Sequence, residues 1–406
     1  MGKGPGAQAE LRRRNFALVT HALAAGEDLT RAAVAAQVGL TRATVSTLVD
    51  ELLAGGLVEE RGARRPGTVG RPGTPLALAD TGPAGVGAEI GVDHLAACVV
   101  DLRGTVRCRA ETPAANRGRK APDVLAELAE LTARVTAAAR EEDLHPVGTT
   151  VAVPGLVGHD RGAVLRAPNL GWEDVPVAAA LGAGTIVENE ANLGALAELW
   201  LGGHRGLADF VHVSAEIGIG AALVVEGRLF RGARGFAGEL GHVPVRPDGP
   251  LCSCGATGCL ETYAGEKALL RAAGLATGDD TEPGTGAGTP ALRAAADAGD
   301  PRALRALDEA GAALGIALSG AVNLLDPQAV VIGGLLADLT PWLLPGVRRE
   351  LATRVTDRQW RPENVVTSAL GRDGVLRGAA CSAVRTVLDD PASWITRNGP
   401  DSGSRA

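Results

Sequence analysis

Apolar residues recur at helical spacing in a segment that begins at Thr41 and ends near Leu53. The apolar positions of this segment are Val45, Leu48, Val49 and Leu52. Side chains three and four residues apart share one face of a helix, so this face is predicted to be buried. Two further helices are predicted upstream, over residues 11–24 and 31–38.

The turns between these helices support the same interpretation. Thr30 is placed to cap the second helix, and Gly39 supplies the tight turn before the third. Residues 55–62 then have the pattern of a helix end, a strand and a wing turn. Three helices followed by a wing predict a winged helix-turn-helix head that binds DNA. A small helical domain that binds a protein is the alternative.

The third helix carries side chains that suit contacts with DNA. Hydroxyl groups and one arginine near its N-terminal end are fitted to phosphates and base edges in a major groove. These residues are Thr41, Arg42, Thr44, Ser46 and Thr47. The arginines available for backbone phosphates beyond the wing are Arg64, Arg65 and Arg71. Because one head reads only a short half-site, we expect a homodimer or homotetramer on a palindromic operator.

A longer region of alternating strands and helices follows the head. It opens with two strand-like runs and an amphipathic helix, over residues 85–92, 96–102 and 122–140. Further strands and a helix are predicted over residues 149–153, 185–188, 191–201, 210–214 and 221–225. Two halves that each contain paired strands predict a duplicated α/β fold with a cleft between the halves.

Charge and hydropathy narrow the class of protein. The net charge of −7 argues against a protein that coats nucleic acids without specificity. Residues 1–80 hold 10 Lys and Arg against 8 Asp and Glu, so a mildly basic head precedes an acidic body. No apolar stretch reaches the roughly 18–20 residues of a membrane span, and the N-terminus lacks the apolar core of a signal peptide. We therefore expect a cytoplasmic protein without a membrane partner.

Three cysteines fall within eight residues, at Cys252, Cys254 and Cys259, and His242 lies ten residues upstream. Three thiolates and one imidazole complete a tetrahedral shell, which is typical of structural zinc. A disulfide is the poorer alternative in a reducing cytoplasm, and a cluster without metal is the other. The remaining cysteines are scattered among apolar residues and are predicted to be buried side chains: Cys98, Cys108 and Cys381.

These motifs give the chain a resemblance to the ROK family of repressors, open reading frames and kinases over residues 11–388. The motifs are Glu239-Leu-Gly-His242, Cys252-X-Cys254-Gly-X-X-Gly-Cys259-X-Glu261 and Val187-Glu-Asn-Glu-Ala-Asn192. The resemblance implies an actin-like ATPase fold, in which two α/β lobes surround a sugar-binding cleft. The predicted domains are a winged helix-turn-helix over 11–80, a sugar-kinase-like sensor over 85–388 and a disordered tail over 389–406.

The resemblance also implies which residues contact a sugar. Side chains that would bind sugar hydroxyls are Asn189, Glu190, Glu239 and Glu261. His242 would place one ring nitrogen on zinc and direct the other towards the sugar. Gly155 and Asn169 match the same cleft, with a plain turn role as the alternative for these two.

Three departures from the family's kinases predict that this chain is not an enzyme. Kinases of the family open with a phosphate loop that resembles Asp-X-Gly-Gly-Thr-Lys, but residues 93–97 here read Asp-His-Leu-Ala-Ala. Glu216 stands in the second phosphate motif, where a carboxylate would repel phosphates. Glu190 stands where the family has a catalytic Asp, and its extra methylene would displace a base by about an ångström, at a cost of about 100-fold.

The sequence thus predicts a sugar-responsive transcriptional regulator whose repression is relieved when a sugar closes the two lobes. The effector is a sugar or a sugar phosphate, since glucose, xylose and amino sugars present hydroxyls of the same kind. An ATP-dependent sugar kinase that carries a DNA-binding head is one alternative. A ligand-independent repressor with a relic cleft is the other.

Overall fold

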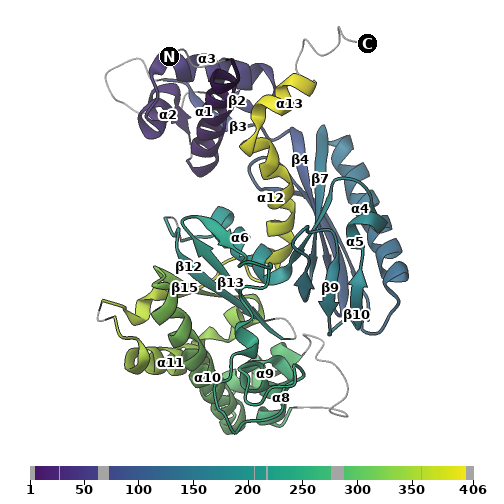
Figure 1. Cartoon of the computed structure of the whole chain (residues 1–406), viewed down its shortest axis with the longest axis vertical. Coiled ribbons are helices and arrows are strands. Elements are labelled where there is room, and N and C mark those ends of the chain that lie inside the picture. Colours follow the sequence, from purple (N-terminus) through teal and green to yellow (C-terminus); the bar gives the residue numbers. More distant parts are fainter. Residues whose placement is uncertain are drawn as a thin grey trace.

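The computed structural model describes residues 5–26, 28–62, 73–204, 206–215, 218–275, 288–357 and 359–398. Its N-terminal part is a small head of three helices and a three-stranded sheet of order β1-β3-β2 (Figure 1). The helices are α1 (Pro5–Ala25), α2 (Arg31–Val38) and α3 (Arg42–Ala54). The strands are β1 (Leu29–Thr30), β2 (Val58–Glu60) and β3 (Pro75–Leu78).

The capping and turn residues of the head act as expected. The Thr30 hydroxyl accepts a hydrogen bond from the backbone N–H of Ala33, and Gly39 ends α2 at a φ of 69°. Thr41 caps α3 by accepting from the Thr44 N–H at 3.1 Å. The predicted apolar face of α3 is buried. One boundary was predicted wrongly, because α1 begins at Pro5 and its first turns are exposed, polar and arginine-rich.

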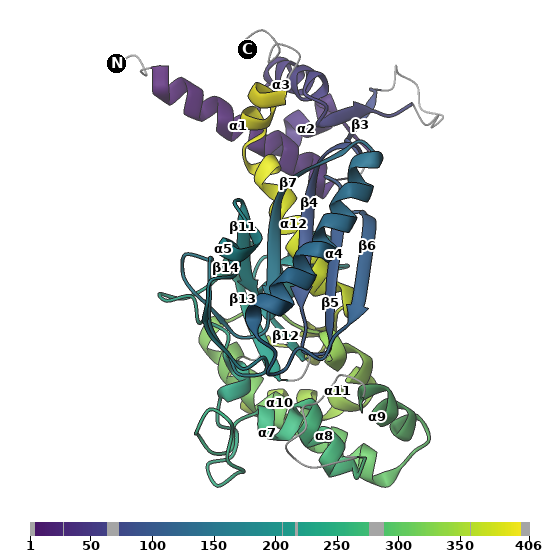
Figure 2. The same ribbon diagram turned by 90° about the vertical axis from the view of Figure 1, so that its right-hand side faces the viewer.

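The first lobe of the body is a five-stranded sheet of order β11-β7-β4-β5-β6. Its strands are β4 (Gly82–Ile90), β5 (His94–Val100), β6 (Val106–Pro113), β7 (Leu144–Val153) and β11 (Thr185–Asn189). Helix α4 (Ala121–Glu141) packs on this sheet from one side and α12 (Asp373–Asp389) from the other (Figure 2). A side sheet at the cleft consists of β8 (Leu156–Val157), β9 (Val164–Ala167) and β10 (Trp172–Val175), followed by α5 (Val177–Leu181).

The second lobe repeats this plan with a sheet of order β14-β13-β12-β15-β16. Its strands are β12 (Phe210–Ala215), β13 (Ile219–Val225), β14 (Arg228–Phe230), β15 (Ala329–Gly333) and β16 (Val365–Thr367). In each lobe an antiparallel strand pair is extended by a parallel strand, β7 beside β4 and β15 beside β12. This repetition confirms the duplicated α/β fold.

Helices of unequal length cover the second lobe. The long pair α10 (Pro301–Leu325) and α11 (Gly334–Arg354) packs against one face of its sheet, and α6 (Glu190–Leu201) packs against β12 and β13. The shorter helices are α7 (Glu261–Ala264), α8 (Glu266–Ala273) and α9 (Gly288–Asp297). Within the described residues no single helix is long and apolar enough to cross a membrane, and only the sharply bent pair of α2 and α3 passes that test jointly.

The prediction of a disordered tail is wrong over residues 389–398, because Asp389 ends α12 and residues 391–398 form α13 (Pro391–Asn398) beside the head (Figure 1). The Asp390 carboxylate accepts from the Ser393 N–H and so caps the first turn. Trp394 is 9 % exposed, and its indole N–H donates to the Gly55 carbonyl at 3.3 Å. Apolar packing on a distant part of the chain thus orders a polar segment. Residues 399–406 lie outside the described part.

We expect Trp394→Ala to loosen the head by removing this packing and leaving the Gly55 carbonyl without its indole donor. Native-state hydrogen exchange of the α3 amides should report an opening free energy lowered by roughly 3 kcal/mol. Thr396→Ala, at an exposed position of the same helix, is the control and should change it by less than about 0.5 kcal/mol. Equal protection in both variants would show that α13 does not stabilise the head.

Candidate functional site

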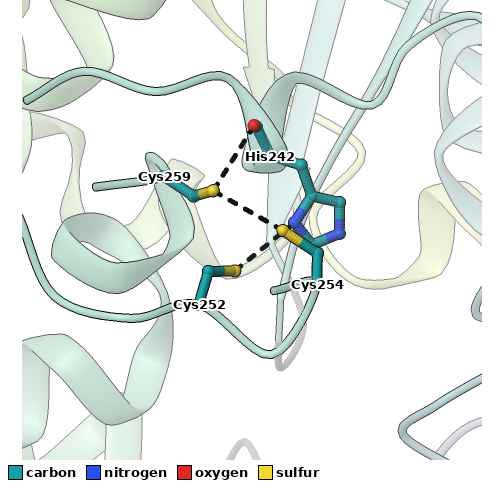
Figure 3. A group of neighbouring side chains, drawn as sticks. All are labelled: His242, Cys252, Cys254 and Cys259. Atoms are coloured by element: carbon teal, nitrogen blue, oxygen red, sulfur yellow. Dashed lines mark hydrogen bonds between the residues drawn. The ribbon is translucent and has the colours of Figure 1, made fainter. Parts of the chain in front are cut away.

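Four potential metal ligands meet in one loop of the second lobe. The ligand atoms of His242, Cys252, Cys254 and Cys259 all lie within 4.8 Å of one another (Figure 3). The Cys252 Sγ is 3.6 Å from the His242 Nδ1, and the Sγ atoms of Cys254 and Cys259 are 3.7 Å apart. These spacings leave room for one central cation surrounded by three sulfurs and one imidazole. The cluster predicted from the sequence is therefore present.

Backbone geometry brings these ligands together. His242 ends a single 3-10 turn over Leu240–His242, and Pro244 then pairs with Cys259 as an antiparallel bridge. Gly258 has a φ of 70°, and a Cβ there would lie 1.6 Å from the Arg246 carbonyl oxygen. Only glycine permits this close approach, which folds the cysteine loop back onto the segment after His242.

Without a metal the pKa values of Cys254 and Cys259 are shifted in opposite directions. Burial, together with the neighbouring thiols, raises the pKa of Cys259 to about 12. A hydrogen bond from the Ala256 backbone lowers the pKa of Cys254. A divalent cation reverses such burial effects by stabilising thiolates, so metal binding here would release protons.

A cavity of about 410 Å³ lies next to the cluster and receives residues from both lobes. Asn169 enters from the first lobe, whereas Gly218, Cys252 and Glu261 enter from the second. Its volume is within the range of about 300–1,000 Å³ that holds small ligands. Three basic residues that were not predicted from the sequence also line it: Arg117, Lys267 and Arg271.

Two carboxylates and the metal-cluster histidine lie close together next to this cavity, and of these three residues only Glu261 lines it. The Glu261 carboxylate accepts from the Ile219 N–H at 3.2 Å. Glu239 places a carboxylate oxygen 3.9 Å from the His242 Nε2, while the His242 Nδ1 faces Cys252. Burial raises the pKa of Glu239, an effect that His242 opposes and Glu261 reinforces. One imidazole therefore faces both the metal cluster and a carboxylate.

The structure gives Asn189 and Gly155 clear architectural tasks. The Asn189 side-chain oxygen accepts from the N–H groups of Ala191 and Asn192, which caps α6. Its amide N–H donates to the Gly155 carbonyl at 2.9 Å, which leaves one amide hydrogen for a ligand. Gly155 has a φ of 120°, and a Cβ there would lie 2.3 Å from the Arg166 carbonyl oxygen. Glu190, half-buried, begins α6; neither it nor Asn189, Gly155 or Glu239 lines the cavity itself.

An ion-pair network beside these residues was not predicted from the sequence. Glu188 on β11 is only 3 % exposed, and its carboxylate accepts from Arg231 at 2.7 Å and from Asn192 at 2.8 Å. Arg161 lies 3.3 Å from the same carboxylate. Because Arg231 follows β14 of the second lobe, Glu188 ties the two lobes together. The only sequence signal was an acidic residue inside an apolar strand.

Between β4 and β5 the chain places a histidine beside two carboxylates instead of a glycine-rich loop. His94 contacts the Asp93 carboxylate at 2.7 Å and the Glu89 carboxylate at 3.6 Å. Burial opposes the charged imidazole, but the hydrogen bonds to Asp93 and Glu89 outweigh it and raise the pKa of His94 to about 10. The ring lies against Gly91, where a Cβ would be 2.2 Å from it. A bulky imidazole thus fills the space beside this turn.

The N-terminal end of α3 exposes the predicted DNA-contacting residues. Thr41, Arg42 and Thr47 are exposed, and Thr44 and Ser46 are half-buried. Acidic groups further along α3 are paired within the head, since Arg31 binds Asp50 at 2.7 Å and Arg12 binds Glu51. Arg64, Arg65 and Arg71 lie outside the described residues, so the contacts predicted for them stay a prediction.

Comparisons with known proteins agree with both parts of the fold. The model of the ROK family matches residues 85–385, and that of the MarR family matches residues 18–67. The xylose repressor of Caldicellulosiruptor bescii is 30 % identical over 398 residues, which cover 94 % of this chain and 98 % of the relative. The xylose repressor of Bacillus subtilis is 28 % identical, with the same coverage. A glucokinase of Streptomyces coelicolor is 32 % identical over 73 % of this chain and 96 % of its own length.

Solved structures also divide into a regulator that matches nearly the whole chain and kinases that match about three quarters of it. A ROK family transcriptional regulator, a homologue of the E. coli MLC protein, superposes with a TM-score of 0.75 at 25 % identity and covers 94 % of this chain and 97 % of its own. A ROK glucokinase from Streptomyces griseus, solved with glucose and AMPPNP, has a TM-score of 0.62 at 29 % identity and covers 73 % and 98 %. The fold is therefore that of a winged helix-turn-helix regulator built on a sugar-kinase scaffold. The chain belongs to the ROK family.

The two carboxylates around His94 should keep its imidazole charged at neutral pH. Its folded-state pKa of about 10 lies above the ordinary 6.5, so the stabilisation is complete below about pH 6.5 and disappears as pH rises through about 10. NMR of the ring should show a protonated His94 at neutral pH. Unfolding in urea should show His94→Gln destabilised most at about pH 6.5 and converging on the parent protein near pH 10. His145→Gln, at an exposed site, serves as the control, and a His94 that titrates near 6.5 would contradict the assignment.

Proposed function

We propose that this chain is a transcriptional repressor that binds an operator through its head and senses a monosaccharide in the cavity between its lobes. The observation that supports this most strongly is the near full-length match to repressors. The head and the sensor of this chain are matched together at 30 % identity by a protein named xylose repressor. Xylose is therefore the first effector to test.

The cavity has the groups that recognise a sugar. Asn169 offers an amide and Glu261 a carboxylate, and both are good partners for vicinal hydroxyls. Glu239, Glu190 and Asn189 do not line this cavity, so the sugar contacts predicted for them stay a prediction. The cations Arg117, Lys267 and Arg271 favour an effector that also bears an anionic group, so a sugar phosphate is the second candidate.

Phosphoryl transfer is the alternative function, and the turn at residues 91–94 speaks against it. Backbone N–H groups of a glycine-rich loop bind phosphates because nothing else fills the space. Here His94 lies against Gly91 and is held by two carboxylates, which would repel a nucleotide. Glu190 also stands where kinases of the family are expected to have an aspartate as the catalytic base. Glu216, the third departure, lies outside the described residues.

The repressor acts as a homodimer or homotetramer in the cytoplasm, since one three-helix head covers only one half-site. Sugar binding closes the lobes and changes the separation of the two heads. This change weakens operator binding because two half-sites must be one helical turn, or a multiple of it, apart. The sugar must bind the closed dimer better than the open one to have this effect.

We predict that the purified protein selects a palindromic duplex from a random pool and that xylose or a xylose phosphate weakens this binding about tenfold or more in fluorescence anisotropy. Arg42→Gln should weaken it about 10- to 100-fold through loss of a base or phosphate contact. Arg134→Gln, an exposed arginine of α4, should bind as the parent does. The same protein with magnesium ATP and sugar should release no ADP. Steady turnover would favour the kinase, and failure to select any duplex would end the repressor proposal.

The metal held by the cysteine loop is zinc in this proposal. Three sulfurs and one imidazole suit a tetrahedral d¹⁰ cation and leave no open position for catalysis. Such a site is structural: it would order the loop whose Cys252 lines the cavity and hold His242 in one orientation. Among the described residues this is the one group of histidines, cysteines and acids with metal-binding spacing.

We expect one zinc ion per chain by plasma mass spectrometry. Cys254→Ser should lose most of this zinc and should weaken sugar affinity, because the loop that forms one wall of the cavity becomes disordered. Cys108→Ser, outside the cluster, should retain the metal and the affinity. Zinc-free parent protein with full stability and unchanged sugar affinity would contradict the assignment.

A further inference from the structure

Helices α6 and α12 lie side by side and run in the same direction. At one end the backbones touch, since a Cβ on Gly378 of α12 would lie 2.1 Å from the Leu193 carbonyl oxygen of α6. Seven residues further along both helices, the Arg385 guanidinium stacks on the Trp200 ring at 4.7 Å. Equal steps of seven residues, about 10.5 Å of helix, mean that the helices keep their register over two turns. If α6 shifts, α12 must therefore shift with it, because otherwise the contacts of Gly378 with Leu193 and of Arg385 with Trp200 would both be strained.

The same arginine also contacts the DNA-binding head. Its guanidinium donates to the His21 Nδ1 at 3.1 Å, and the His21 Nε2 lies 2.8 Å from an Asp389 carboxylate oxygen. Since the guanidinium can only donate, Nδ1 is the accepting nitrogen and Nε2 carries the proton that is donated to Asp389. One residue earlier, the buried Thr20 hydroxyl donates to the Leu388 carbonyl at 2.8 Å. Helix α1 is therefore attached to the end of α12 at two neighbouring residues.

Helix α6 begins beside the proposed sugar site, next to a segment of the first lobe: a Cβ on Gly155 would lie 2.8 Å from the Ala167 Cα, two residues before Asn169 of the cavity. Asn189 caps it and is hydrogen-bonded to the Gly155 carbonyl of the first lobe, and Glu190 is its first residue. At its other end stands Trp200, against Arg385. A change in the cleft therefore reaches Trp200 through a rigid helix of twelve residues.

We propose that Arg385 is the positioning residue that couples the sugar site to the DNA-binding head. It is held by Trp200 of the sensor and by His21 of the head, so a displacement of α6 changes the geometry at α1. The chain continues from α12 into α13, whose Trp394 holds the Gly55 carbonyl at the end of α3. The positions of α1 and α13, the two helices that fix the orientation of the head, therefore both depend on the position of the end of α12. This inference rests on the proposed function, since it needs a ligand in the cleft and an operator on the head.

The assignment predicts a loss of communication without a loss of either binding activity. The experiment compares full-length Arg385→Gln, Arg385→Lys and the control Arg134→Gln with the parent protein. Operator affinity is measured with and without xylose, and xylose affinity is measured with and without the operator. Coupling is reciprocal, so both ratios report the same factor.

In the parent protein and in Arg134→Gln we expect a factor of about 10 in both ratios. Arg385→Gln should reduce both to about twofold or less, while the affinities of operator alone and of xylose alone change by less than about threefold. Arg385→Lys keeps the charge over Trp200 and should recover part of the factor. Equal weakening of operator binding with and without xylose would show a merely structural role and overturn the proposal.

A ligand-free measurement keeps the proposal testable if xylose is not the effector. Asn189→Ala removes the cap of α6 and should change the operator affinity of the unliganded protein. In a double-mutant cycle this effect should largely vanish in the Arg385→Gln background, because the path from α6 to the head is already broken. Additive effects would overturn the coupling role of Arg385. An absent xylose response together with a non-additive cycle would count against xylose as the effector while supporting the coupling role.

Discussion

The close approach of α12 to β4 is the contact on which the whole arrangement depends. Gly85 and Gly87 of β4 have no side chains, and a Cβ on Gly85 would lie 2.0 Å from the Ala380 carbonyl oxygen. This approach buries the apolar face of α12 against the first sheet and brings its far end to the head. The head, β5, α12 and Trp394 therefore share one continuous hydrophobic core. The orientation of the head relative to the first lobe is therefore set by the packing of this shared core.

The metal cluster and the cavity depend on each other in a similar way. Cys252 is a member of the cluster and also lines the cavity, and His242 faces Cys252 with one nitrogen and Glu239 with the other. Glu261 follows Cys259 by two residues and enters the cavity at the start of α7. A bound cation would thus hold one wall of the cavity in place. The pairing of Glu188 with Arg231 joins the two lobes that supply the walls of this cavity.

Features with a local cause could be predicted from the sequence. The apolar spacing in α3, the Thr30 and Gly39 positions and the three cysteines within eight residues each specify their own geometry. Features that depend on distant partners could not. Trp394 is ordered by Gly55, 339 residues away, and Arg231 finds Glu188 only because the lobes meet. Asn189 shows a third case: its position before α6 explains it as a cap, a role that family resemblance alone did not indicate.

The position of α13 has a consequence for the gene. A stop codon directly after Asp389, the last residue of α12, would leave the coding sequence of the head and of both lobes, yet the product would lack the contact of Trp394 with Gly55 at the end of α3. Such a shortened polypeptide would be expected to keep a folded sensor domain but to bind DNA more weakly through its head. For the same reason a reporter protein joined directly after Asn398, the last residue of α13, would begin beside the head, at the opposite end of the described residues from α8 and α9 (Figure 2).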